Sequence, residues 1–312
     1  MVSLNSQGKE NKMNLKHITV AALTLLSGAV FAQNYAPVRA DVRQMHIYQP
    51  NTWAVRQGAK ISNQLNSYEV ILAMTKPMNN KPTQMWIRIW AGDFGFCPLT
   101  RSFKLDVNGI GMEKLNVKTS DVQPWKEGKN AGIKIALNYD GCKFDVIFYM
   151  RPDSPVLWGM IRPSANTLED IKTAVMTFTC IPSTLARNAK KVPIWGGPEY
   201  GREIVTNART YPASARVYPL AKDDVSFIFR DTKFDGSAKD KSKGVGPVWL
   251  QIDQTSVVNG KIRSTNEWTN WIQLNLNPAM KEFKFGMWQQ QMPISNADFD
   301  KKLKAEKAAF TR

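Results

Sequence analysis

The stretch Ile133–Met150, IKIALNYDGCKFDVIFYM, decides the fold class. Apolar and polar residues alternate along it, as expected for strands with one buried and one solvent-facing side. Asp140 and Gly141 stand between the two halves, and such a pair can adopt the positive φ angles that a tight turn between antiparallel strands requires. The sequence therefore predicts a β-hairpin.

Runs with the same period of two recur roughly every 10–20 residues along the chain. They lie at residues 68–74, 85–90, 102–107, 156–161, 173–181, 225–230, 248–253, 271–276 and 283–289. No amphipathic helices stand between them to connect parallel strands. This spacing favours an antiparallel sandwich or barrel over an α/β fold, and we predict an all-β fold, a large antiparallel β-sandwich.

Only the C-terminus has the pattern of a helix. Ser295 is a suitable N-cap, and Asp298 favours the positive first turn. Phe299, Leu303 and Phe310 fall on one stripe. We predict a short C-terminal α-helix docked on the sandwich.

Residues 1–32 have the order of a secretory signal. Lys16 precedes an apolar run from Ile18 to Val30, and cleavage is expected after Ala32. Met13 is a possible true start. The run is shorter than the roughly 20 residues that cross a bilayer, and no later segment is long and apolar enough, so no transmembrane segment is expected in the mature chain. We predict a periplasmic or secreted protein; the alternative for this segment is a buried N-terminal helix.

The mature chain, residues 33–312, is predicted to be one large β-sandwich domain. A split into two sandwiches near residues 182–193 is the alternative, because PSTLARNAKKVP has the composition of a linker. We find no sequence repeat across it, and all-β domains reach this size. The polar stretch 231–246 is predicted to be a long exposed loop.

The chain is strongly basic. Residues 1–32 have a net charge of +2, so the formal +16 of all 312 residues becomes +14 without them. Such a charge attracts polyanions. The expected partner is a carbohydrate or another anionic envelope polymer, whereas nucleic acid is not expected because of export and because no recognised binding motif is present.

Three cysteines leave at least one thiol unpaired. Cys180 ends an apolar row and is predicted to be a buried free thiol. The best disulfide candidate is Cys97 with Cys142.

Motifs for metal or cofactor chemistry are absent from the sequence. Only His46 remains in the mature chain and the cysteines are far apart, so no metal site is predicted. Phosphate-binding glycine loops and a serine elbow are missing, and no cofactor is expected. His46 is a weak catalytic candidate, with an ordinary strand residue as the favoured interpretation.

The segment WGGPEYGRE, residues 195–203, is the other catalytic candidate. Glu199 or Glu203 could act as a general acid or base, Tyr200 as a proton donor and Arg202 as a carboxylate clamp. The glycines and the proline are explained by a tight turn. A structural turn is the favoured interpretation.

Tryptophan gives the most informative pattern. In four predicted strands, tryptophan falls on the side of the polar residues and opposite the aliphatic ones. The residues on these polar sides are Trp86, Arg88 and Trp90, then Trp249 and Gln251, then Trp271 and Gln273, and finally Trp288.

A tryptophan buries about 150–250 Å², so something must cover these rings. Indole faces beside Gln and Arg suit sugar recognition, because the rings stack on pyranose and the polar groups bind hydroxyls. Trp86 and Trp90 would lie about 13 Å apart, and Arg88 between them could bind a uronate or sulfate. The alternative is coverage by a loop or the C-terminal helix, with Arg88 stacked between the rings.

The leading hypothesis is an exported, basic β-sandwich protein that binds carbohydrate, in particular acidic glycan, without catalysis. One alternative is a carbohydrate-active enzyme, such as a polysaccharide lyase, a glycosidase or a mutarotase-like epimerase. The other is a structural or adhesive protein of the cell envelope. No signature decides between an enzyme and a binding protein.

Overall fold

The computed structural model divides into two compact units, residues 1–35 and 36–312, and the second contains the fold. The structure describes residues 35–44, 53–75, 85–91, 94–95, 102–180, 185–187, 193–195, 202–212, 216–232, 247–264, 270–290 and 294–310. The proposed leader, residues 1–32, lies outside these ranges.

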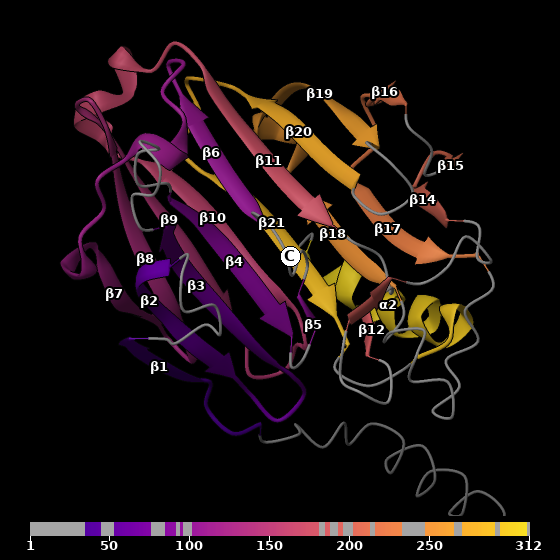
Figure 1. Ribbon diagram of the computed structural model, residues 1–312. Coiled ribbons are helices and arrows are strands. Elements are labelled where there is room, and N and C mark those ends of the chain that lie inside the picture. The colour runs from indigo at the N-terminus through magenta and orange to yellow at the C-terminus, as the bar shows by residue number, and fades with distance from the viewer. Residues whose placement is uncertain are drawn as a thin grey trace, which may run out of the picture. The chain divides into compact units, whose positions relative to one another are not determined.

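Two large antiparallel sheets form the fold (Figure 1). The ten-stranded sheet has the order β1 (Arg39–Gln44), β2 (Trp53–Ser62), β3 (Ser67–Thr75), β4 (Met85–Ala91), β6 (Phe103–Val107), β11 (Ala174–Cys180), β20 (Asn270–Leu276), β19 (Val257–Ser264) and β16 (Val217–Pro219), with β5 (Phe94–Gly95) paired to β4. The nine-stranded sheet has the order β15 (Thr210–Pro212), β14 (Arg202–Thr206), β17 (Ser226–Asp231), β18 (Val248–Ile252), β21 (Phe283–Gln289), β10 (Leu157–Pro163), β9 (Cys142–Met150), β8 (Asn130–Tyr139) and β7 (Val122–Glu127).

The remaining elements are short. β12 (Leu185–Arg187) and β13 (Pro193–Trp195) pair as a separate hairpin, inside and just beyond the stretch that the sequence suggested as a linker. Short 3-10 helices are η1 (Met112–Lys114), η2 (Thr119–Asp121), η3 (Ala165–Asp170) and η5 (Gln254–Ser256). Each large sheet contains strands from both sides of residues 182–193. The antiparallel all-β sandwich predicted from the sequence is confirmed.

The hairpin that decided the fold class joins β8 to β9. Asp140 and Gly141 both have positive φ, 51° and 98°, as the tight turn requires. The Gly141 N–H donates to Asn138 Oδ1 at 2.9 Å, and this side-chain bond stabilises the turn. Ile133, Ile135 and other alternate residues then point to the same side of the sheet and are fully buried.

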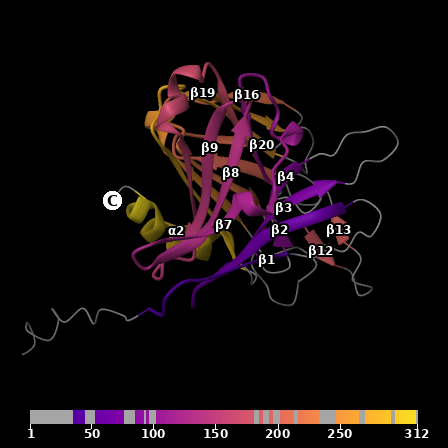
Figure 2. The ribbon, with the colours of Figure 1, turned by 90° about the vertical axis from the view of Figure 1, so that its left-hand side faces the viewer.

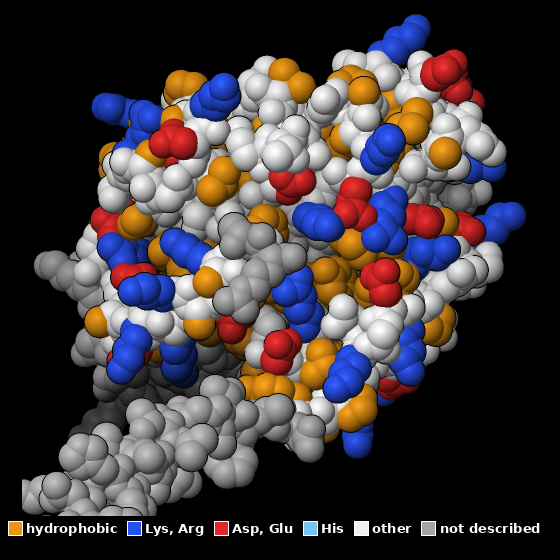
Figure 3. All heavy atoms as spheres, turned by 180° about the vertical axis from the view of Figure 1, so that it is seen from behind, with side chains coloured by type: hydrophobic (Ala, Val, Ile, Leu, Met, Phe, Trp, Pro, Cys, Tyr) orange, Lys and Arg blue, Asp and Glu red, His pale blue; other side chains and the backbone are white. Residues whose placement is uncertain are grey.

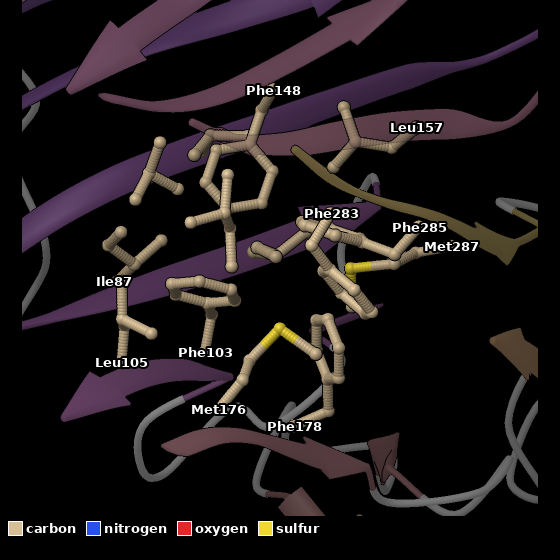
Figure 4. Close-up of a cluster of buried hydrophobic side chains, with 14 of the residues drawn as sticks. Ile87, Phe103, Leu105, Phe148, Leu157, Met176, Phe178, Phe283, Phe285 and Met287 are labelled. Carbon is tan, nitrogen blue, oxygen red and sulfur yellow. The ribbon is translucent and has the colours of Figure 1, made fainter. Parts of the chain in front are cut away.

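The core fills the space between the two large sheets (Figure 4). Phe103 of β6 lies edge-on to Phe148 of β9 at 5.5 Å between ring centroids, and Phe178 of β11 packs on Phe285 of β21 at 4.9 Å. Each pair joins one sheet to the other. Gly159 makes room for this packing, because a Cβ there would lie 2.0 Å from Cζ of Phe285.

Buried polar bonds also tie the sheets together at one end. Asn66 Nδ2 donates to the carbonyl oxygens of Pro155 and Gln289, each at 3.0 Å. The Tyr68 hydroxyl donates to the same Pro155 oxygen at 2.9 Å. Burial raises the pKa of Tyr68 well above its ordinary value, so the phenol keeps the proton that it donates.

The C-terminal helix α2 (Asn296–Phe310) lies on the outer side of the nine-stranded sheet, opposite the β12–β13 hairpin (Figure 2). Ser295 caps it, because its Oγ accepts from the Asp298 N–H at 3.1 Å. Phe299 and Leu303 are buried on the sheet. The docked helix and its cap are therefore as predicted.

The cysteines depart from one expectation. Cys180 is fully buried, as predicted. Cys142 is buried and free, and Asn108 Nδ2 approaches its sulfur at 3.5 Å. The proposed Cys97–Cys142 disulfide is therefore not formed; Cys97 itself lies outside the described ranges. Burial raises the pKa of the Cys142 thiol.

None of the helices that the structure describes is long and apolar enough to cross a membrane.

Candidate functional site

Two rows of side chains cross the outer side of the ten-stranded sheet, and together with Trp90 we call them the polar face. On the inner side of the sheet, strand register places four apolar residues in one line across neighbouring strands: Ile87, Phe103, Phe178 and Ile272. The outer residues on either side of that line form the two rows. The first row is Arg88, Ser102, Thr179, Trp271 and Arg263, and the second is Trp86, Lys104, Thr177, Gln273 and Lys261.

This register brings together five of the residues that the sequence singled out. Trp86, Arg88 and Trp90 come from β4, whereas Trp271 and Gln273 come from β20. β6 and β11 lie between these strands, so three strand spacings separate them, about 14 Å in total. Residues that are far apart in the chain thus share one side of one sheet.

The polar face differs between its two ends. At the β4 end Trp86 and Arg88 are buried, with exposed fractions of 8% and 4%, and Trp86 packs on Ala73. At the β20 end Trp271 and Gln273 are half-buried and the neighbouring Arg263 is exposed. Trp90, further along β4, is half-buried like Trp271. Among the described residues, the β20 end combines a half-buried tryptophan with exposed cations on the neighbouring strand β19.

Arg263 sits over the ring of Trp271. Its guanidinium carbon lies 5.3 Å from the ring centroid, within the range of a cation–π contact. The adjacent Asn275 amide donates to Asn259 Oδ1 on β19. These cross-strand contacts fix the orientation of the side chains at the open end.

The charges along the polar face are unevenly compensated. Lys104 lies between Asp106, at 2.8 Å, and Glu113, at 3.1 Å. Desolvation opposes the charged form of Lys104, but these two carboxylates outweigh it and raise its pKa. Lys261 and Arg263 have no ion pair with any residue that the structure describes. Among the described residues, no carboxylate pairs with the two cations of the open end.

Three predicted ligand-binding residues are not available to a ligand. Trp249 and Trp288 lie side by side on β18 and β21, with exposed fractions of 0% and 1%, and Gln251 is also buried. Helix α2 covers this part of the nine-stranded sheet, and Phe299 stacks on Trp288 at 4.6 Å. Trp249 Nε1 donates to Ser226 Oγ at 2.9 Å. Trp249 and Trp288, predicted to bind a ligand, thus pack beneath a helix, and Gln251, on the same strand as Trp249, is buried.

Of the catalytic candidates, Glu203 is the one whose side chain the structure describes. Glu203 accepts a hydrogen bond from Arg230 Nε at 2.6 Å, and Arg230 Nη1 also donates to Asp300 of α2 at 3.1 Å. Glu203 therefore takes part in an ion pair that holds the helix. His46, Glu199 and Tyr200 lie outside the described ranges, and only the backbone of Arg202, the first residue of β14, is described.

Sequence reasoning missed Lys261 and Arg263. Both were visible as the polar positions of the alternating stretch Val257–Ser264, VVNGKIRS, in which Ile262 is buried. Their pairing with Gln273 and Trp271 could not be inferred, because it depends on the register between β19 and β20.

Metal-binding clusters of three or more His, Cys, Asp or Glu residues do not occur in the part of the chain that the structure describes.

Comparison with known proteins gives distant structural matches. No protein-family model matches the chain, and no curated protein matches it. Among solved structures, it is similar to the α-N-acetylgalactosaminidase NagBb from Bifidobacterium bifidum, as complexes with Gal-NHAc-DNJ (9% identity, TM-score 0.45) and with GalNAc (7%, 0.42), and to an α-galactosidase from Lactobacillus brevis (9%, 0.33). The matches cover 86%, 80% and 78% of this chain but only 38%, 36% and 40% of those chains. This chain thus spans less than half the length of the proteins that it matches.

Proposed function

We propose that this protein binds an acidic carbohydrate, without catalysing a reaction, at the β20 end of the polar face. One observation supports this above the others: on β20 the half-buried Trp271 is paired with the exposed Arg263, and the half-buried Gln273, two residues along, is paired with the exposed Lys261. A flat apolar ring bordered by fixed polar groups matches the two kinds of surface that a sugar ring presents.

The geometry suits a chain of sugars rather than one ring. Gln273 and Lys261 are opposite each other, and the pair Trp271 and Arg263 lies two residues along, about 7 Å away. Hydroxyl groups of neighbouring sugar units would then meet polar groups of successive rows, while Trp271 provides apolar area.

The preference for an acidic ligand follows from charge. Lys104 is neutralised by its two carboxylates, whereas Lys261 and Arg263 are exposed at the open end. Arg263 could bind a carboxylate or sulfate through two parallel hydrogen bonds. The formal charge of +14 that remains without residues 1–32, from +16 for all 312 residues, attracts such polymers from a distance.

The proposal includes export. A signal peptide over residues 1–32 would send residues 33–312, as one domain, to the periplasm or the outside of the cell, where acidic polysaccharides are present. Mass spectrometry of the secreted protein would test this part, with a mature N-terminus at Gln33 as the expected result.

Calorimetric titration with a panel of acidic and neutral oligosaccharides tests the binding. We expect Trp271→Ala to weaken binding at least tenfold, because losing half of a tryptophan's burial costs about 2 kcal/mol. Lys261→Ala with Arg263→Ala should weaken the acidic ligands, with little change for neutral ones, and should flatten the salt dependence.

Trp125→Ala is the matched control. Trp125 is also half-buried, but it lies on the outer side of the nine-stranded sheet and packs on Tyr149 at 4.9 Å. Its loss should leave binding unchanged. The proposal fails if the wild-type protein binds no member of the panel, or if Trp271→Ala and Trp125→Ala have equal effects.

A further inference from the structure

A polar cleft of about 550 Å³ lies at the end of the nine-stranded sheet next to the β8–β9 turn. Its walls come from residues 115–118, from η2, and from β8, β9 and the end of β10 with Ser164. None of the catalytic or ligand-binding candidates named from the sequence lines this cleft. Clefts between about 300 and 1,000 Å³ are of the size that holds small ligands.

The acidic groups of the cleft are already engaged. Asp121 Oδ2 accepts the backbone N–H of Lys118 at 2.8 Å, which closes the turn at η2. Asp145 Oδ2 lies 3.6 Å from Lys134 Nζ. Lys134 thus pairs with the charge of Asp145, whereas the hydrogen bond to Asp121 holds that carboxylate in the turn without neutralising it.

Arg162, which also lines the cleft, is likewise engaged. Its Nε donates to Glu282 Oε2 at 2.5 Å. Burial disfavours the ionised form of Glu282, but the hydrogen bonds from Arg162 and Lys284 outweigh burial and lower its pKa. Glu282 therefore stays ionised at neutral pH and compensates the charge of Arg162.

Two further cations line the cleft. Lys118 lies on the loop before η2 and Lys143 lies on β9, and both are exposed. Neither forms an ion pair with any residue in the described ranges. We propose that this cleft binds a small oxyanion, a sulfate, phosphate or carboxylate, between Lys118 and Lys143.

The rest of the lining supplies hydrogen-bond donors for such a group. Asn138 Oδ1 is used by the turn, which leaves its Nδ2 as a donor, and the Asn116 amide and the Ser164 hydroxyl also line the cleft. The volume admits an oxyanion alone or one attached to a sugar. Basic and acidic side chains are interspersed on the face of the molecule that Figure 3 shows.

The test is calorimetric titration of the full chain with inorganic sulfate, inorganic phosphate, glucose 6-phosphate, glucuronate and glucose. We expect at least one oxyanion to bind, glucose not to bind here, and the double variant Lys118→Ala, Lys143→Ala to weaken oxyanion binding at least about tenfold. If inorganic ions bind as well as their sugar counterparts, the ligand is a free anion; if only the sugar compounds bind, the sugar contributes. Both results support the site.

Lys301→Ala with Lys302→Ala is the matched control, because it removes the same charge from exposed positions on α2. It should leave binding unchanged. The inference is overturned if no oxyanion binds, or if the two double variants have equal effects. The double variant Lys118→Gln, Lys143→Gln removes the same charges but keeps most of the side-chain volume. Its thermal unfolding shows whether a loss of binding comes from a folding defect. Trp271→Ala affects the opposite side of the sandwich, so failure here is distinguishable from failure of the carbohydrate proposal.

Discussion

The two outer sides of the sandwich both have tryptophan at the polar positions of their strands, but these tryptophans differ in how far they are buried. On the nine-stranded sheet, α2 covers Trp249 and Trp288 completely. On the ten-stranded sheet, Trp271 stays half-buried beside the exposed Arg263. Tryptophan among polar positions therefore has two outcomes, and the difference lies in whether the chain supplies its own apolar cover.

The closed side shows what such a cover requires. Phe299 stacks on Trp288, and Phe310 stacks on Trp158 at 5.7 Å. Arg151 also lies over Trp158, at 4.2 Å from the ring centroid. The indole N–H groups of Trp158 and Trp288 are buried without a hydrogen-bond partner among the described residues, and each costs about 1–3 kcal/mol. The indole N–H of Trp271 is buried in the same way, so the two sides differ in the aromatic packing of α2 and not in these N–H groups.

The largest expected effect is on stability at the closed side. Trp288→Ala should lower the free energy of unfolding by about 3–5 kcal/mol, because it leaves a cavity beneath α2. Trp271→Ala should lower it by about 1 kcal/mol or less, since it removes a half-exposed ring and one cation–π contact. Urea titration measures both. Equal losses would mean that Trp271 is a packing residue and would remove the contrast between the two sides.

Local patterns predicted the elements, because their determinants are adjacent in sequence. The Asp140–Gly141 turn and the Ser295 cap each depend on residues within a few positions. The alternation of polar and apolar residues along each strand also predicted that Trp249 and Trp271 lie on the side opposite the aliphatic residues. It could not tell which outer side α2 would cover, because that depends on the order of strands from distant parts of the chain. The same limit hid the register of Arg263 with Trp271 and the cleft between Lys118 and Lys143.

A smaller effect is expected from the ion pair that holds α2. Glu203→Ala should lower the free energy of unfolding by about 1–3 kcal/mol, because Arg230 loses a charge-assisted hydrogen bond in a partly buried position. Carbohydrate and oxyanion binding should be unchanged, since Glu203 belongs to neither site. Denaturant titration and calorimetry on the same variant measure the two quantities.

Glu127→Ala provides the reference for Glu203→Ala. Glu127 ends β7 and is exposed, so its removal changes the net charge equally with little effect on stability. A loss of ligand binding in Glu203→Ala with unchanged stability would give this carboxylate a functional role and would argue against the purely structural assignment.

The smallest effect concerns pH at the closed side. Burial raises the pKa of Glu306, which accepts a hydrogen bond from Ser154 Oγ at 2.6 Å, above its ordinary value of 4.5. Between these two values the folded state binds more protons than the unfolded state, so the contribution of Glu306 to stability is present below pH 4.5 and is lost as pH rises through the raised pKa. Glu306→Gln should therefore raise the free energy of unfolding at pH 7, by less than about 1 kcal/mol after solvent screening, and should leave it nearly unchanged at pH 4.

Glu282→Gln should instead lower the free energy of unfolding at pH 7, because the pKa of Glu282 is lowered and its ionised form stabilises the fold above pH 4.5. Unfolding curves at the two pH values separate the variants by sign, and a loss of stability in Glu306→Gln at pH 7 would mean that the ionised carboxylate holds α2 in place.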